Sequence, residues 1–64
     1  MDKYAISFYK LPGSYKYRIK VQNTYTYKYV EDIEVHDKGI DETMKVVNKL
    51  REKYVPSYVC EVYY

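Results

Sequence analysis

The side chains best suited to catalysis in this chain are a single cysteine, a single histidine and a run of carboxylates. Cys60 and His36 would serve as nucleophile and base, but Cys60 alternates with Tyr58 and Val62, a spacing typical of a small side chain buried on a strand. The six carboxylates within residues 31–42 would suit a divalent cation or an acid–base pair. Their spacing matches no known metal loop, and neither a glycine-rich phosphate loop nor a hydrolase motif occurs. We therefore predict that the protein is not an enzyme and holds no metal or cofactor.

A second group of residues with chemical potential consists of cations that share one face of a predicted strand. Lys16, Arg18 and Lys20 alternate with apolar residues, so they lie on the face opposite the apolar one. The register derived below brings Lys28 and Tyr9 to the same face without a carboxylate. Phosphates would relieve the repulsion between these cations, Arg18 would read a guanine edge, and Tyr9 would stack on an unpaired base. The pattern predicts a DNA-binding or other nucleic-acid-binding face.

Two other interpretations of the charges and the tyrosines stay open. A lysine-rich strand face is often only a solvated surface, and the sequence pI of about 8.6 lies below the range typical of dedicated DNA-binding proteins. The alternative function is a protein-binding module, such as a phage or viral accessory protein that inhibits a host complex. Tyrosine is favoured in protein interfaces, and the acidic segment 31–42 would imitate phosphate. The residues predicted for this protein interface are Tyr27, Tyr29, Tyr58, Tyr63 and Tyr64.

Three stretches of alternating polarity must position these side chains. Residues 4–10, 15–22 and 25–35 alternate apolar and polar residues with the period of half-buried β-strands. Pro12 and Gly13 form the first turn, because proline fixes φ and glycine permits a positive φ. The sequence therefore predicts a three-stranded antiparallel meander.

The register of the two hairpins decides which side chains share a face. A four-residue turn over 11–14 gives the first hairpin the apolar pairs Phe8 with Tyr17, Ile6 with Ile19 and Tyr4 with Val21. A three-residue loop over 22–24 gives the second hairpin the pairs Val21 with Tyr25, Ile19 with Tyr27 and Tyr17 with Tyr29. The same register places Arg18 opposite Lys28, a repulsive contact that a polyanionic partner would relieve.

A helix and a fourth strand are expected in the second half of the chain. Asp41 is the predicted helix N-cap, and Pro56 ends the helix. The apolar residues at helical spacing are Met44, Val47, Leu50 and Tyr54. Residues 57–64 alternate again and predict a strand that joins the first strand in parallel, in the order 3-2-1-4, although the other edge stays open. With the helix over the apolar face, the prediction is a two-layer α+β domain of order βββαβ that spans residues 1–64.

The composition limits the class of protein. The chain has 64 residues, of which 47% are hydrophobic, and 11 of them are tyrosines. A domain of this size is marginally stable, and a single cysteine excludes an internal disulfide, so we expect a homodimer. No apolar run approaches the ~18 residues of a membrane-spanning helix, and no targeting segment is recognised. These features predict a cytoplasmic protein, in the host cytoplasm if it is viral, with no membrane partner.

Overall fold

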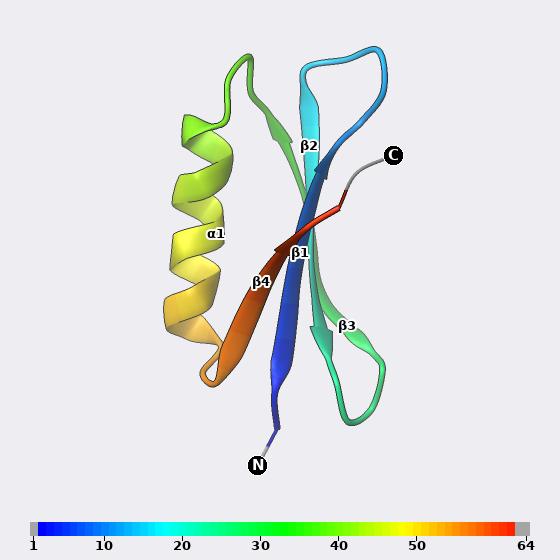
Figure 1. Ribbon diagram of the computed structural model, residues 1–64, viewed down its shortest axis with the longest axis vertical. Helices are drawn as coiled ribbons and strands as arrows, with labels where there is room; N and C mark the ends of the chain where they lie inside the picture. The colour runs from blue at the N-terminus through cyan, green and yellow to red at the C-terminus, as the bar shows by residue number, and fades with distance from the viewer. Residues whose placement is uncertain (1, 63–64) are drawn as a thin grey trace.

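The computed structural model describes residues 2–62 and shows a four-stranded sheet with a helix on one face (Figure 1). The elements are β1 (Tyr4–Lys10), β2 (Lys16–Asn23), β3 (Tyr29–His36), α1 (Asp41–Lys53) and β4 (Ser57–Glu61). The sheet order is β3-β2-β1-β4, with β4 parallel to β1 and the other neighbours antiparallel. The predicted α+β class, the βββαβ order and the edge chosen for β4 are confirmed. No helix among the described residues is long and apolar enough to cross a membrane.

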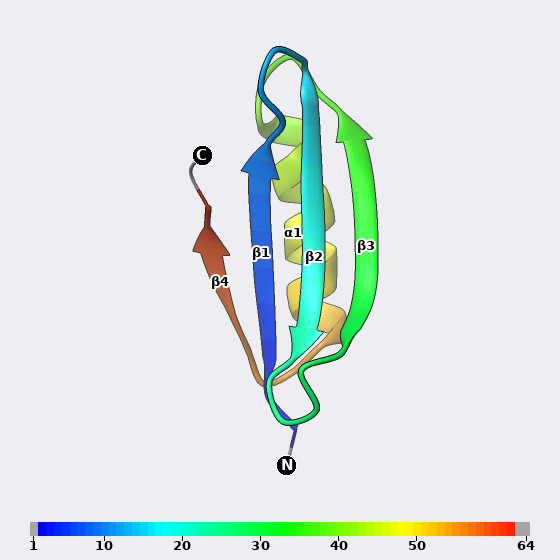
Figure 2. The same cartoon turned by 90° about the vertical axis from the view of Figure 1, so that its right-hand side faces the viewer.

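The hydrophobic core lies between α1 and one face of the sheet, which we call the inner face. Every second residue of β1 and β2 points toward the helix, and helical spacing brings Val47 and Leu50 to meet them. Figure 2 shows α1 behind β1 and β2. The buried hydrophobic residues are Ile6, Phe8, Ile19, Val21, Val47 and Leu50. No described element covers the opposite face, which we call the outer face.

A polar cluster closes the core beside the last turn of α1. The rings of Tyr54 and Tyr4 pack with their centroids 4.8 Å apart. The Tyr54 hydroxyl donates to Glu31 Oε2 at 2.6 Å, and Lys53 Nζ donates to the same oxygen at 2.9 Å. These hydrogen bonds, that of Tyr54 foremost, lower the pKa of Glu31, while the bond to Glu31 raises the pKa of Tyr54. The cluster ties β3 to the end of the helix.

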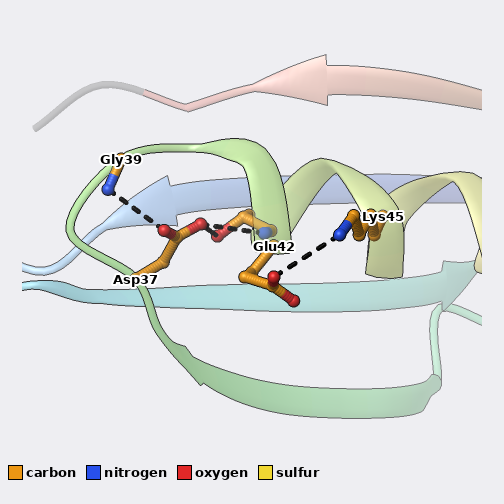
Figure 3. A network of polar contacts seen from close by, with 5 residues as sticks. Asp37, Gly39, Glu42 and Lys45 are labelled. Atoms are coloured by element: carbon orange, nitrogen blue, oxygen red, sulfur yellow. Dashed lines mark hydrogen bonds and ion pairs between the residues drawn. The ribbon is translucent and has the colours of Figure 1, made fainter.

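Asp37 caps the start of α1, not Asp41 as predicted. Asp37 Oδ2 accepts hydrogen bonds from the Thr43 backbone N–H at 3.0 Å and from the Thr43 hydroxyl at 3.1 Å, and Asp37 Oδ1 accepts one from the Gly39 N–H at 3.0 Å (Figure 3). Ile40, which directly precedes the helix, has no side-chain acceptor. The backbone N–H of Thr43 is the main reason why the pKa of Asp37 lies below its ordinary value. Asp41 instead lies in the first turn, where its negative charge interacts favourably with the helix dipole.

The first hairpin differs in register from the prediction. Lys10 pairs with Tyr17, two residues beyond its predicted partner. The connection is residues 11–15, and the backbone N–H of Leu11 donates to the carbonyl of Lys16 at 2.8 Å. Because the shift is two residues, each side chain keeps its predicted face.

The second hairpin departs further from its predicted register. β2 continues to Asn23, and the connection to β3 is residues 24–28 instead of 22–24. In this register Ile19 pairs with Ile33 rather than with a tyrosine. Two branched aliphatic side chains therefore pack under the helix, where a phenol would need a buried partner for its hydroxyl.

Candidate functional site

The outer face of the sheet carries charges of both signs, not the cluster of cations that the sequence predicted. Arg18 lies opposite Glu34. Its guanidinium Nε and Nη2 donate to the two carboxylate oxygens of Asp32 at 2.8 and 2.9 Å. Lys16 Nζ lies 3.3 Å from Glu34 Oε1. The predicted pairing of Arg18 with Lys28 is wrong, because β3 supplies carboxylates at these positions.

The ion pair with Asp32 occupies the side chain best suited to reading a base edge. The two N–H groups of Arg18 that would fork onto guanine both point at one carboxylate. The hydrogen bonds from Arg18 lower the pKa of Asp32, and the charge of Lys20 adds to the effect. A guanine edge would have to displace this carboxylate. Nucleic-acid binding by Lys16, Arg18, Lys20, Lys28 and Tyr9 stays a prediction.

Reversing the charge at Arg18 should destabilise the protein, and reversing both partners should restore it. In Arg18→Asp the new carboxylate lies beside Asp32 and Glu34, so we expect the melting temperature to fall by about 2–4 °C. Adding Asp32→Arg to that variant rebuilds the ion pair in the opposite sense. Thermal unfolding followed by circular dichroism compares the two variants. A double variant no more stable than the single one would contradict the pairing.

The carboxylates of the acidic segment 31–42 are mostly engaged within the chain. Glu31 binds α1, Asp37 caps it, and Glu42 pairs with Lys45 at 3.5 Å. The carboxylates of β3 that face outward pair with β2. No group of three or more His, Cys, Asp or Glu side chains within residues 2–62 is placed to hold a metal ion. The segment therefore offers a basic partner little of the free charge that imitation of phosphate would need.

The structure does not bring Cys60 and His36 together. They lie on β4 and β3, the two opposite edges of the sheet. Cys60 is exposed, contrary to its predicted burial. Val59 pairs with Ile6 and packs against the core, so its neighbours Tyr58 and Cys60 point to the outer face.

The loop between β2 and β3, at the bottom of Figures 1 and 2, and the start of β3 carry exposed tyrosines. Tyr25 and Tyr27 lie in the loop 24–28 and are 65% and 75% exposed. Tyr29 begins β3 just before a bulge, lies beside Gln22 and is 60% exposed. The prediction that these three rings face the helix is therefore wrong. With the lysines around them they form what we call the tyrosine–lysine surface: Tyr25, Tyr27, Tyr29, Tyr58, Lys3, Lys20 and Lys28.

Three lysines lie among these rings. Lys20 Nζ is 5.1 Å from the ring centre of Tyr29, and Lys3 Nζ is 5.3 Å from that of Tyr58, both within cation–π range. Lys28 belongs to the loop itself. Among the described residues, no carboxylate forms an ion pair with any of the three. Lys20 lies across from Asp32, whose carboxylate is held by Arg18. The surface therefore combines exposed rings with three cations that form no direct ion pair within residues 2–62.

Two members of this surface were missed from the sequence. Tyr25 was assigned to the inner face because its alternation fits a strand. The charge pattern, with cations on β2 and carboxylates on β3, was a signal that would have moved it into the loop. Lys3 lies beside the loop because its carbonyl accepts hydrogen bonds from Thr24, a long-range contact that no local sequence pattern reveals. The predicted interface residues Tyr63 and Tyr64 lie outside the described residues.

Comparisons of the chain with protein-family models, with curated proteins and with solved structures find no match.

Proposed function

We propose that the protein is a small non-catalytic module that binds single-stranded nucleic acid through the tyrosine–lysine surface. The observation that carries the proposal is the set of four tyrosine rings, 47% to 75% exposed, beside three lysines. Such rings stack on unpaired bases of any sequence, and lysines neutralise the phosphates that accompany them. The bases of a duplex are already stacked on one another, so a single strand suits this surface better.

Duplex binding by the outer face has less support. That mode would use the cations of β2 as phosphate contacts and as a reader of base edges. Lys16 and Arg18 are instead paired with Glu34 and Asp32. Their charge would reach a polyanion only after these ion pairs broke.

A labelled oligothymidine should bind the protein with an affinity that falls as salt rises. Three lysine–phosphate contacts predict a slope of about −2 for log K against log salt concentration, since single strands give about −0.7 per contact. Replacing Lys3, Lys20 and Lys28 together by glutamine should abolish most of the binding and flatten the slope. Fluorescence anisotropy across a salt series measures both quantities.

The matched control removes the same charge from other parts of the molecule. Lys38, Lys45 and Lys49, replaced together by glutamine, should leave the affinity and the slope close to those of the unaltered protein. Equal losses in the two triple variants would show a net-charge effect and overturn the proposal. Stronger binding of a hairpin duplex, lost with Lys16→Ala and Arg18→Ala, would favour the outer face instead.

A protein partner is the second candidate, favoured by exposed apolar side chains near the same end of the sheet. Val30 adjoins Tyr29, Val55 precedes β4, and both are exposed. Stacking on bases gives these valines no role, whereas a protein interface would bury them. The viral accessory role belongs to this candidate, whereas the expected homodimer and cytoplasmic location are compatible with both candidates. A native mass equal to two chains, together with no binding of oligothymidine, would favour it.

A further inference from the structure

We infer that the loop 24–28 is a preorganised stacking platform, in which Tyr25 and Tyr27 each hold one unpaired base. The inference rests on the proposed binding of single-stranded nucleic acid and goes beyond it. It identifies the residues that recognise bases, as distinct from the lysines that neutralise phosphates.

Asn23 organises this loop from inside the protein. The residue is only 7% exposed, and its Oδ1 accepts hydrogen bonds from the backbone N–H groups of Tyr25 at 2.9 Å and Thr26 at 3.2 Å. The backbone carbonyl of Asn23 accepts from the N–H of Tyr27 at 2.8 Å, and its N–H donates to the carbonyl of Lys28 at 2.9 Å. One buried residue therefore fixes the backbone of four consecutive loop residues.

Two further contacts anchor the loop to its surroundings. Gln22 Nε2, on the outer face, donates to the carbonyl of Tyr27 at 3.1 Å. The hydroxyl and the N–H of Thr24 donate to the carbonyl of Lys3 at 2.8 and 2.9 Å. The loop backbone is thus fixed on both sides while the two rings project into solvent. Little conformational entropy then remains to be lost when a base stacks, which favours binding.

The backbone of Tyr27 adopts a conformation that tyrosine normally avoids. Its φ is 61°, in the left-handed region that asparagine and glycine enter far more readily. A loop optimised for stability alone would carry one of those residues at this position. Strained positions of this kind cluster where the side chain has a use, and here the strained residue carries the most exposed ring of the surface.

The first test compares oligothymidine with an abasic strand of the same length. The abasic strand keeps the phosphates and has no base to stack. The double variant Tyr25→Ala, Tyr27→Ala should bind oligothymidine at least about 30-fold more weakly than the unaltered protein, since two stacked bases are lost. The double variant should bind the abasic strand as tightly as the unaltered protein does, and the salt slopes of the two proteins should be the same. This difference separates stacking from phosphate contacts.

Tyr15 supplies a matched control at the opposite end of the sheet. It is 55% exposed, and Lys10 Nζ lies 5.7 Å from its ring centre, so it has the same kind of environment as the rings of the surface. Tyr15→Ala should leave the affinity for both strands unchanged. A loss equal to that of the Tyr25 and Tyr27 variant would overturn the inference.

Tyr27→Asn gives a second readout that a purely structural role would not produce. Asparagine accepts the left-handed backbone, so the melting temperature should rise by about 2–5 °C. Affinity for oligothymidine should fall about 10-fold in the same variant. If the unaltered protein binds neither strand, the proposed function and the inference both fail. If it binds both strands with equal affinity, and the tyrosine variants bind as it does, the proposed function holds and the inference is overturned.

Discussion

Replacing Ile19 by alanine should bring the protein to the edge of unfolding. Ile19 is fully inaccessible (0% exposed) and pairs with Phe8 on one side and with Ile33 on the other. Truncating a branched side chain at such a site costs about 2–5 kcal/mol. A domain of this length has only ~3–10 kcal/mol of stability in total. We expect the melting temperature to fall by at least ~10 °C, measured by circular dichroism.

Ile40→Ala is the matched control, because it removes the same atoms from an exposed isoleucine beside α1. Its melting temperature should lie within about 2 °C of that of the unaltered protein. Urea unfolding of both variants gives the free energies directly. A loss of stability in Ile19→Ala no larger than that in Ile40→Ala would contradict the position of the core.

Acidification should also lower the melting temperature strongly. Hydrogen bonds to Glu31, Asp32 and Asp37 each hold the pKa of that carboxyl below its ordinary value. The folded protein therefore binds these protons less tightly than the unfolded chain does. The stabilisation is fully present above the ordinary carboxyl pKa of about 4 and is lost as pH falls toward the lower folded values. The melting temperature should be nearly constant from pH 7 to 5 and should fall steeply below about pH 4.

Asp37→Asn isolates the contribution of the helix cap. The amide oxygen still accepts the hydrogen bonds of Thr43, but the amide nitrogen cannot accept from the Gly39 N–H, and the side chain carries no charge, so the variant should melt below the unaltered protein at pH 7. The difference should shrink as the pH falls below the ordinary carboxyl pKa and Asp37 itself takes up a proton. Asp41→Asn removes an exposed carboxylate from the same turn and serves as control. A difference between Asp37→Asn and the unaltered protein that stays the same throughout the acid range would contradict this role.

The order of the elements could be predicted because each one has a strong local signal. Alternation in residues 4–10 and helical spacing up to Leu50 do not depend on partners. Gly13 adopts a φ of 72°, as the turn chemistry requires. The parallel direction of β4 follows from the crossover through a helix, but the crossover suits either edge of the meander; the observed pairing places Val59 beside Ile6 of β1.

The register of the second hairpin could not be derived from alternation alone, because a tyrosine is compatible with either the buried or the exposed face of a sheet. Tyr25 and Tyr27 alternate as well as aliphatic residues would, yet their hydroxyls are better placed in water. The charges across the β2–β3 pair distinguish the predicted register from the observed one. The predicted contact of Arg18 with Lys28 was repulsive, and the observed one gives Arg18 the carboxylate of Asp32. That repulsion was a sign of the wrong register rather than of a missing polyanion.

Part of the tyrosine–lysine surface could be predicted from the sequence, because the chemistry of an exposed tyrosine does not depend on the register. Tyr58 and Tyr29 were assigned to an interface from their chemistry, which does not depend on register. The loop that carries Tyr27 depends on Asn23. The side chain of this buried residue accepts hydrogen bonds from the loop backbone at Tyr25 and Thr26. Lys3 is added by its carbonyl contact with Thr24, 21 residues away, and no local pattern carries that information.

The parallel pairing of β1 with β4 has a consequence for the order in which the protein folds. α1 and β4 follow the meander in the chain, so the apolar side chains of β1 and β2 lack a covering layer until α1 docks. The contacts within the meander are local and form fast, whereas the docking of α1 and β4 closes a long loop and is slow. The ion pairs between β2 and β3 need neither of those later elements. The β2–β3 pairing can therefore form early in folding, and the docking of α1 and β4 then completes the core and the sheet.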